Sequence, residues 1–136
     1  NSIISKGNVT SRTAYEVMPF ENSVVVVELK GESLMKMVEY LIHSKRAHPI
    51  AGAQLILNKN NTVKAFTVNG KPIDKNKSYY VATSDYLVTG GDNMGFFKDA
   101  ISKMETDYKI RNAMIDFFSK VDTLAPKVDL RYYQLQ

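Results

Sequence analysis

Four consecutive valines, Val24 to Val27, are followed after one charged residue by Leu29. A segment this uniformly apolar predicts a central strand that is buried on both faces, and Gly31 is expected to end it. Residues 78–83 alternate with β-branched and aromatic side chains, which predicts a half-buried strand. This second strand is expected to complete a largely antiparallel set.

Helical periodicity marks three segments. Thr10 or Ser11 can cap a short helix that runs to Met18, because the residue before Pro19 is disfavoured in the helical region. A longer helix is predicted from about Glu32 to Ser44, and a last helix from Thr106. The apolar residues on the face of the longer helix are Leu34, Met37, Val38, Leu41 and Ile42. Those expected to be buried by the last helix are Ile110, Met114, Phe117, Phe118 and Val121.

Turn residues and short apolar runs predict the remaining elements. These are a basic connector over 45–49, a hairpin of 53–58 and 62–68, a type I′ turn at Asn69-Gly70, a helical turn over 94–101 that contains Phe96 and Phe97, and a final strand over 128–134. Hairpins and helices occur without regular β-α-β alternation, and we find no repeat or linker. The 136 residues therefore predict a single α+β domain with a mixed, largely antiparallel sheet and packed helices.

Composition narrows the function only modestly. The absence of cysteine excludes thiol chemistry and disulfides, and leaves the compartment open. The net charge of +4 arises from scattered Lys and Arg residues, so we expect mild attraction to anions but no nucleic-acid partner. No apolar run approaches the ~20 residues of a membrane span. The chain carries no signal peptide and starts without Met, so we expect it to be trimmed or processed.

The strand over 78–83 leads into the most informative stretch. Polar residues at Ser84-Asp85 suit a turn or helix N-cap, which places Tyr86 just past the strand end. Gly90-Gly91 allows a ligand or another backbone to approach closely, and Asp92 then projects from a loop. An aromatic ring can stack on a base, and an ionised carboxylate can accept from two ribose hydroxyls. The stretch predicts a nucleoside receptor.

Two motifs together resemble the C-terminal, substrate-binding domain of the 5′-nucleotidase family, which includes bacterial periplasmic UDP-sugar hydrolases. Pro19-Phe20-Glu21-Asn22 matches the family's Pro-Phe-x-Asn, and 84–92 matches its Asn-Asp-Tyr/Phe-Leu-x-x-Gly-Gly-Asp with Ser84 in place of the first Asn. The likeness covers nearly the whole chain. It implies a nucleotide or nucleoside ligand and a periplasmic, cell-envelope or extracellular location.

The resemblance assigns roles to individual residues. Phe20 and Tyr86 would form an aromatic clamp around the nucleobase, and Asp92 would hold the ribose hydroxyls. Asn22 would lie near the base edge, while Gly91, like Gly90, would shape the loop. Each stacked face is worth about 1–3 kcal/mol, so losing either ring should weaken binding roughly tenfold or more.

The departures from the family are equally informative. The family carries an Asn-Gly-Gly-x-Ile/Leu-Arg segment just before the position of Asn1, and its arginine, which helps to hold the anionic part of the substrate, is missing here. Hydrolysis in the family belongs to a separate metallophosphoesterase domain with a two-metal centre. The only histidines, His43 and His48, lack metal-ligand patterning, so we expect no cofactor in this chain and no activity from it alone.

Each candidate also has a purely structural alternative. Phe20 could plug the core, and Tyr86 could be a packed ring with a satisfied hydroxyl. Asp92 could form an Asx-turn or cap the segment that follows it, and Asn22 could be a turn former.

The leading hypothesis is therefore the nucleotide-recognising domain of a 5′-nucleotidase-like hydrolase, with the catalytic domain supplied in cis or in trans. A stand-alone nucleoside-binding module that never catalyses is the alternative. A basic surface-interaction domain with a vestigial pocket is the third hypothesis, and it predicts salt-sensitive binding to polyanions.

Overall fold

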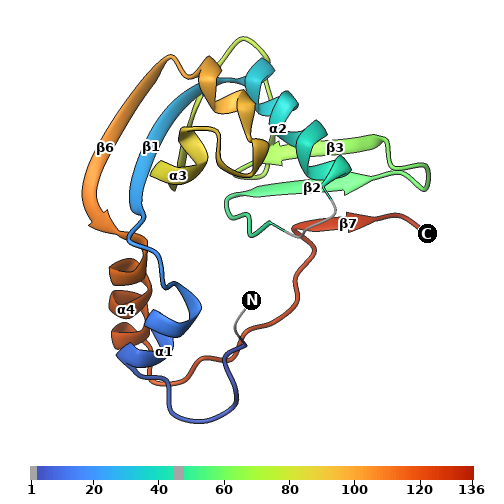
Figure 1. Cartoon of the computed structure of the whole chain (residues 1–136). Helices are drawn as coiled ribbons and strands as arrows, with labels where there is room; N and C mark the ends of the chain where they lie inside the picture. The colour runs from blue at the N-terminus through green and yellow to red at the C-terminus, as the bar shows by residue number, and fades with distance from the viewer. Residues whose placement is uncertain (1–2, 45–47) are drawn as a thin grey trace.

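The computed structural model describes residues 3–44 and 48–136, and its strands form two sheets (Figure 1). The first has the order β5-β1-β6 and the second the order β4-β3-β2-β7. Within the described residues, neighbouring strands are antiparallel except β2 and β7, which are parallel. Helices pack beside these sheets, so the fold is α+β, as the sequence predicts.

Strand β1 (Ser23–Lys30) is central in the first sheet, between β5 (Ser78–Ser84) and β6 (Ser102–Lys109). Val25, Val27 and Leu29 are buried, whereas the alternate residues from Val24 to Glu28 are only half-buried. The central position confirms the prediction, but burial on both faces is wrong. The reason is that the core shared with α2 and the 3₁₀ segments lies on one face of this sheet.

Helix α2 (Gly31–His43) starts directly where β1 ends. The N–H of Gly31 donates to the carbonyl of Lys77 at 2.9 Å, which satisfies one of the free donors of the first helical turn. A Cβ at Gly31 would lie 2.2 Å from the carbonyl oxygen of Asp74. Gly31 therefore permits close approach of the 74–77 loop, in addition to marking the strand end.

The second sheet contains the predicted hairpin, formed by β2 (Ala53–Leu57) and β3 (Val63–Val68). The next turn leads to β4 (Lys71–Pro72) through Asn69 and Gly70, whose φ angles of 49° and 74° are both left-handed, as a type I′ turn requires. Only Tyr132–Gln134 of the predicted final strand pairs, as β7. Residues 45–47 of the predicted connector lie outside the described part.

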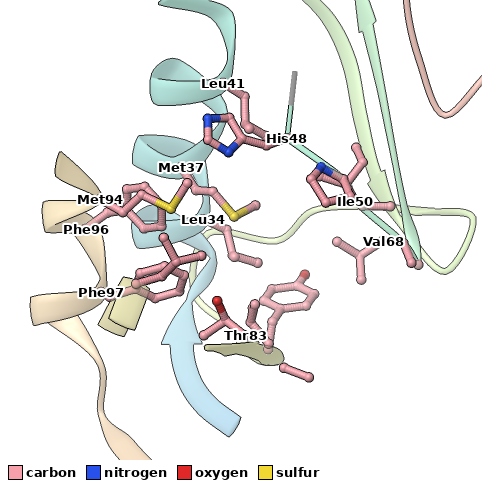
Figure 2. A pocket seen from close by; sticks show the side chains of 18 of the residues that line it. Leu34, Met37, Leu41, His48, Ile50, Val68, Thr83, Met94, Phe96 and Phe97 are labelled. Atoms are coloured by element: carbon pink, nitrogen blue, oxygen red, sulfur yellow. The ribbon is translucent and has the colours of Figure 1, made fainter. Parts of the chain in front are cut away.

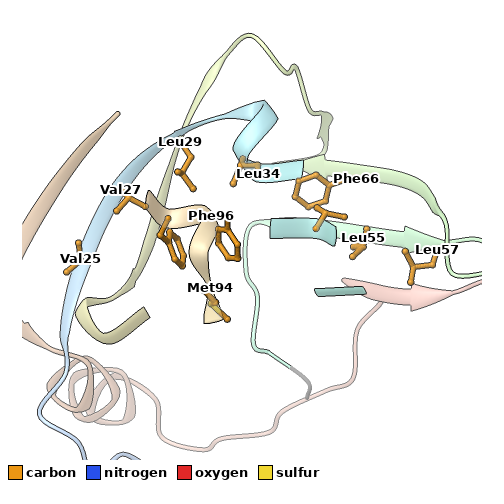
Figure 3. Close-up of a cluster of buried hydrophobic side chains, with 11 residues drawn as sticks. Val25, Val27, Leu29, Leu34, Leu55, Leu57, Phe66, Met94 and Phe96 are labelled. Carbon is orange, nitrogen blue, oxygen red and sulfur yellow. The ribbon is translucent and has the colours of Figure 1, made fainter. Parts of the chain in front are cut away.

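One core joins the two sheets (Figure 3). The 3₁₀ helix η2 (Gly95–Asp99) confirms the predicted helical turn and inserts Phe96 and Phe97 between the sheets. The buried cluster comprises Val25, Val27, Leu29, Leu34, Val38, Leu55, Leu57, Phe66, Met94, Phe96 and Phe97.

Two predictions for the C-terminal segment are wrong: the start of the last helix and the burial of its apolar residues. Thr106 lies in strand β6, and the last helix, α4, is Ile110–Lys120. The helix packs on α1 (Ser11–Val17), away from the second sheet, so it is covered on one side only (Figure 1). Phe117 is consequently 55% exposed, and the other four predicted core residues of this helix are half-buried.

Candidate functional site

The loop after β5 is built around a capped single turn. Ser84 caps α3 (Asp85–Val88), and its hydroxyl accepts from the N–H of Leu87 at 3.1 Å, as predicted. Gly90 then has φ of 101°, and the chain continues into the 3₁₀ turn η1 (Gly91–Asn93) with Asp92 at φ 52°. This left-handed backbone turns the loop back towards α3.

Tyr86, Gly91 and Asp92 are brought together. A Cβ on Gly91 would lie 2.5 Å from Cε1 of Tyr86, so the ring rests directly against the glycine. The Tyr86 hydroxyl donates to Oδ1 of Asp92 at 3.2 Å, and the Tyr40 hydroxyl donates to the Asp92 carbonyl at 2.8 Å. The N-cap positions of η1 and η2 are Gly90 and Met94, so the alternative role of Asp92 as a helix cap is wrong.

Asn22 is tied to the same loop from the other side. Its amide donates to Oδ1 of Asp85 at 2.8 Å, and the N–H of Ser23 donates to Oδ2 at 3.2 Å. The hydrogen bond from Asn22, followed by that from Ser23, lowers the pKa of Asp85 below its ordinary value. Asn22 therefore joins the segment that carries Phe20 to the segment that carries Tyr86.

The two rings both face solvent. Phe20 is 66% exposed, so the alternative of a core plug is wrong. Tyr86 is 50% exposed, but its ring rests against Gly91 and its hydroxyl bonds to Asp92, which agrees in part with the alternative of a packed ring with a satisfied hydroxyl. Phe20 lies two residues before Asn22, and Tyr86 directly follows Asp85. The hydrogen bond between Asn22 and Asp85 thus joins the two chain segments that carry these exposed rings.

Sequence reasoning missed the role of Asp85. The sequence indicates only a turn or cap at this position, whereas the carboxylate accepts hydrogen bonds from Asn22, Ser23 and Tyr86. The position of an acidic side chain directly before Tyr86 was the one sequence signal that could have indicated this role. Its partner on a distant segment could not be identified from the spacing of residues.

A separate apolar cavity of about 570 Å³ lies between α2, β5 and the second sheet (Figure 2). Leu34, Met37, Phe66 and Val68 contribute to its lining. None of the five predicted site residues lines it, although Leu87, the neighbour of Tyr86, does. The predicted site is therefore a surface feature distinct from this cavity.

Metal ligands do not gather in the described residues. Residues 3–44 and 48–136 contain no group of three or more His, Cys, Asp or Glu side chains that could hold a metal ion. His48 Nε2 lies 3.1 Å from the Ser44 hydroxyl, and His43 Nδ1 lies 2.8 Å from the Glu39 carbonyl. The donor set of this part of the chain does not fit a two-metal centre. No helix among these residues is long and apolar enough to span a bilayer.

Sequence comparisons point to one family. A model of the family described as "5′-nucleotidase, C-terminal domain" matches residues 1–99. Protein UshA of Yersinia enterocolitica is 30% identical over 93 residues, which make up 65% of this chain and 17% of that protein. The 5′-nucleotidase of Rattus norvegicus is 24% identical over 144 residues, covering 93% of this chain and 25% of its own length.

Solved structures share the fold. The 5′-nucleotidase precursor from Thermus thermophilus superposes with a TM-score of 0.82 at 20% identity, over 93% of this chain and 28% of that one. The NAD nucleotidase of Haemophilus influenzae gives 0.71 at 22% identity, over 88% of this chain and 26% of that one. The chain thus spans no more than a quarter of the two sequence relatives. Because the family model matches more than half of its residues, the chain belongs to the 5′-nucleotidase C-terminal domain family.

Proposed function

We propose that this domain recognises the nucleoside part of a nucleotide for a 5′-nucleotidase-like hydrolase. The observation that carries the proposal is the pair of exposed rings, Phe20 and Tyr86, on segments joined by the hydrogen bond between Asn22 and Asp85. A base between the rings would stack on both faces. The names of the rat and Haemophilus relatives, a 5′-nucleotidase and an NAD nucleotidase, agree with a nucleotide ligand.

Asp92 would hold the ribose. Its carboxylate lies beside the Tyr86 hydroxyl, at 3.2 Å, so the acceptor for sugar hydroxyls would lie at the edge of the stacking surface. Tyr40 fixes the backbone of Asp92 by its hydrogen bond to the carbonyl. The Asp92 carboxylate is exposed and can accept further hydrogen bonds.

In this proposal the chain supplies selectivity and orientation, and phosphate-ester hydrolysis takes place in a metallophosphoesterase domain in cis or in trans. A divalent metal pair in that domain would supply the nucleophile and stabilise the leaving group. The proposal also places the protein in the periplasm, the cell envelope or outside the cell.

Calorimetry with adenosine and AMP at millimolar ligand tests the proposal. We expect measurable binding that Phe20→Ala and Tyr86→Ala each weaken about tenfold or more. Phe117→Ala removes a comparably exposed ring from α4 and should leave the affinity unchanged. If neither ligand gives heat that depends on Tyr86, recognition by the two rings is excluded for this domain.

The gene sequence upstream of this domain distinguishes the hydrolase from the alternative, a stand-alone binding module. A continuous upstream reading frame with Asp-x-His and Gly-Asn-His-Asp motifs supports the hydrolase in cis. A short leader followed only by this domain favours a binding protein or a two-chain enzyme. Incubating the isolated domain with AMP and divalent metal, and then adding a metallophosphoesterase chain, separates these two, because only the two-chain enzyme should release phosphate.

A further inference from the structure

The linker between α1 and β1, residues 18–22, carries Phe20 and is held by residues at the junction of β6 and α4 as well as by Asp85 of α3. Lys109, the last residue of β6, donates from Nζ to the Glu21 carbonyl at 2.8 Å and to the Ser23 hydroxyl at 3.0 Å. These contacts lie on the C-terminal side of Phe20. They fix the path of the chain between the ring and the start of β1.

Arg111 binds the linker on both sides of the ring. Its Nη2 pairs with the Glu21 carboxylate, and its Nη1 donates to the Met18 carbonyl at 3.4 Å. The guanidinium carbon also lies 3.9 Å from the centroid of the Tyr15 ring on α1. One side chain therefore holds the residues that flank Pro19 and Phe20, while proline restricts the backbone between them.

The burial of Arg111 suggests a geometric role. The residue is only 5% exposed and is the buried residue of α4, and its Nε has no hydrogen-bond partner among the described residues. Only the Arg111 side of the pair is buried, since the Glu21 side chain is 69% exposed, and the cost of removing the guanidinium from water offsets much of the attraction between the two charges. The pair does, however, fix the positions of the groups that Arg111 contacts, the Glu21 carboxylate and the Met18 carbonyl.

We infer that Arg111, with Lys109, is a positioning residue that holds the Phe20 ring ready to stack. The inference rests on the proposed function for its biological meaning, although the position of the ring can be measured without a ligand. Both cations lie beyond residue 99, so a segment outside the part matched by the family model would set one side of the binding surface.

The test uses ¹⁹F NMR with 4-fluorophenylalanine at position 20. Glu21→Gln removes the charge from the partner of Arg111, and Arg111→Lys keeps the charge but removes the two-point grip. Glu105→Gln is the matched control: its side chain is 71% exposed, against 69% for Glu21, and it is paired with Lys103 at 2.6 Å on β6. We expect the first two variants to broaden or shift the resonance towards that of the free amino acid, and the control to leave it unchanged.

Adenosine titrations of the same variants connect ring position to binding. Glu21→Gln should weaken affinity about three- to tenfold, less than the loss of the ring itself, and should have no further effect in a Phe20→Ala background. If the ring resonance is unchanged in folded Glu21→Gln, or if this substitution weakens binding equally without the ring, the inference is wrong. If the resonance responds but the wild-type chain binds no nucleoside, positioning stands and the proposed function fails.

Discussion

The amide of Asn22 donates a 2.8 Å hydrogen bond to Oδ1 of Asp85, which is 63 residues further along the chain. Together with the bond from the N–H of Ser23 to Oδ2, this contact connects the segment after α1 to the first turn after β5. Since Phe20 and Tyr86 lie within two residues of its ends, it relates the two proposed stacking rings to each other. Its removal should therefore affect both stability and binding.

Asp85→Ala should destabilise the domain. The substitution leaves the Asn22 amide and the N–H of Ser23 without their acceptor, and hydrogen bonds to a charged group contribute about 1.5–3 kcal/mol. Urea unfolding measures the difference. Asp107→Ala, at an exposed position of β6, is the control and should change stability far less. An Asp85 variant as stable as wild type would show that the bond does not hold the two segments together.

The contribution of Asp85 should depend on pH in a defined direction. Its pKa is lowered first by the hydrogen bond from Asn22, then by those from Ser23 and Tyr86, with Lys109 as a nearby cation. A carboxylate with a lowered folded pKa stabilises fully above its unfolded pKa, and this stabilisation is lost as the pH falls through the folded value. The difference in unfolding free energy between wild type and Asp85→Ala should shrink in acid. A difference that stays constant from neutral to strongly acidic pH contradicts this.

Gly91→Ala should impair binding more than folding. The new Cβ would lie 2.5 Å from the Tyr86 ring, and this half-exposed ring can rotate away without disturbing the core. Displacing one stacking face should lower adenosine affinity about tenfold. Gly95→Ala, where nothing lies within 4 Å of the new Cβ, is the matched control. Calorimetry should separate the two variants, and equal affinities would show that the Tyr86 position does not matter.

Gly31→Ala should have the opposite profile. Here the Cβ would meet the backbone of Asp74 at 2.2 Å, which a side-chain rotation cannot relieve. We expect a loss of about 1–3 kcal/mol in unfolding free energy, as for other overpacked sites. The ligand affinity of the folded fraction should be unchanged, because the site lies at the other end of β1. Thermal unfolding measures the loss, with Gly95→Ala as the control. A Gly31→Ala variant that unfolds at the same temperature as Gly95→Ala would contradict this prediction.

The pattern of apolar residues was sufficient to predict the elements that have one buried face and one more exposed face. It predicts the central valines of β1, the stripe of α2 and the hairpin of the second sheet. The pattern fails for β6, which is polar, largely exposed and held by its pairing with β1. Pairing across more than 70 residues leaves no local signal, so the periodicity wrongly extends the last helix into this strand.

The candidate site also contains residues that the sequence predicts and residues that it does not. Phe20, Tyr86, Gly91 and Asp92 are predicted as site residues from local motifs, and the structure shows the exposed rings and the contact between Tyr86 and Asp92. The groups that hold the rings in place could not be predicted. Asp85, Lys109 and Arg111 act through partners that are remote in sequence.

Intermolecular NOEs between adenosine and the protein test the central claim most directly. If the base stacks between Phe20 and Tyr86, the H2 and H8 protons of adenine should show NOEs to the ring protons of both residues, and Phe20→Ala should remove those to Tyr86 only in part. NOEs to the methyl groups of Leu34 and Val68 instead would place the base in the apolar cavity and contradict the two-ring site.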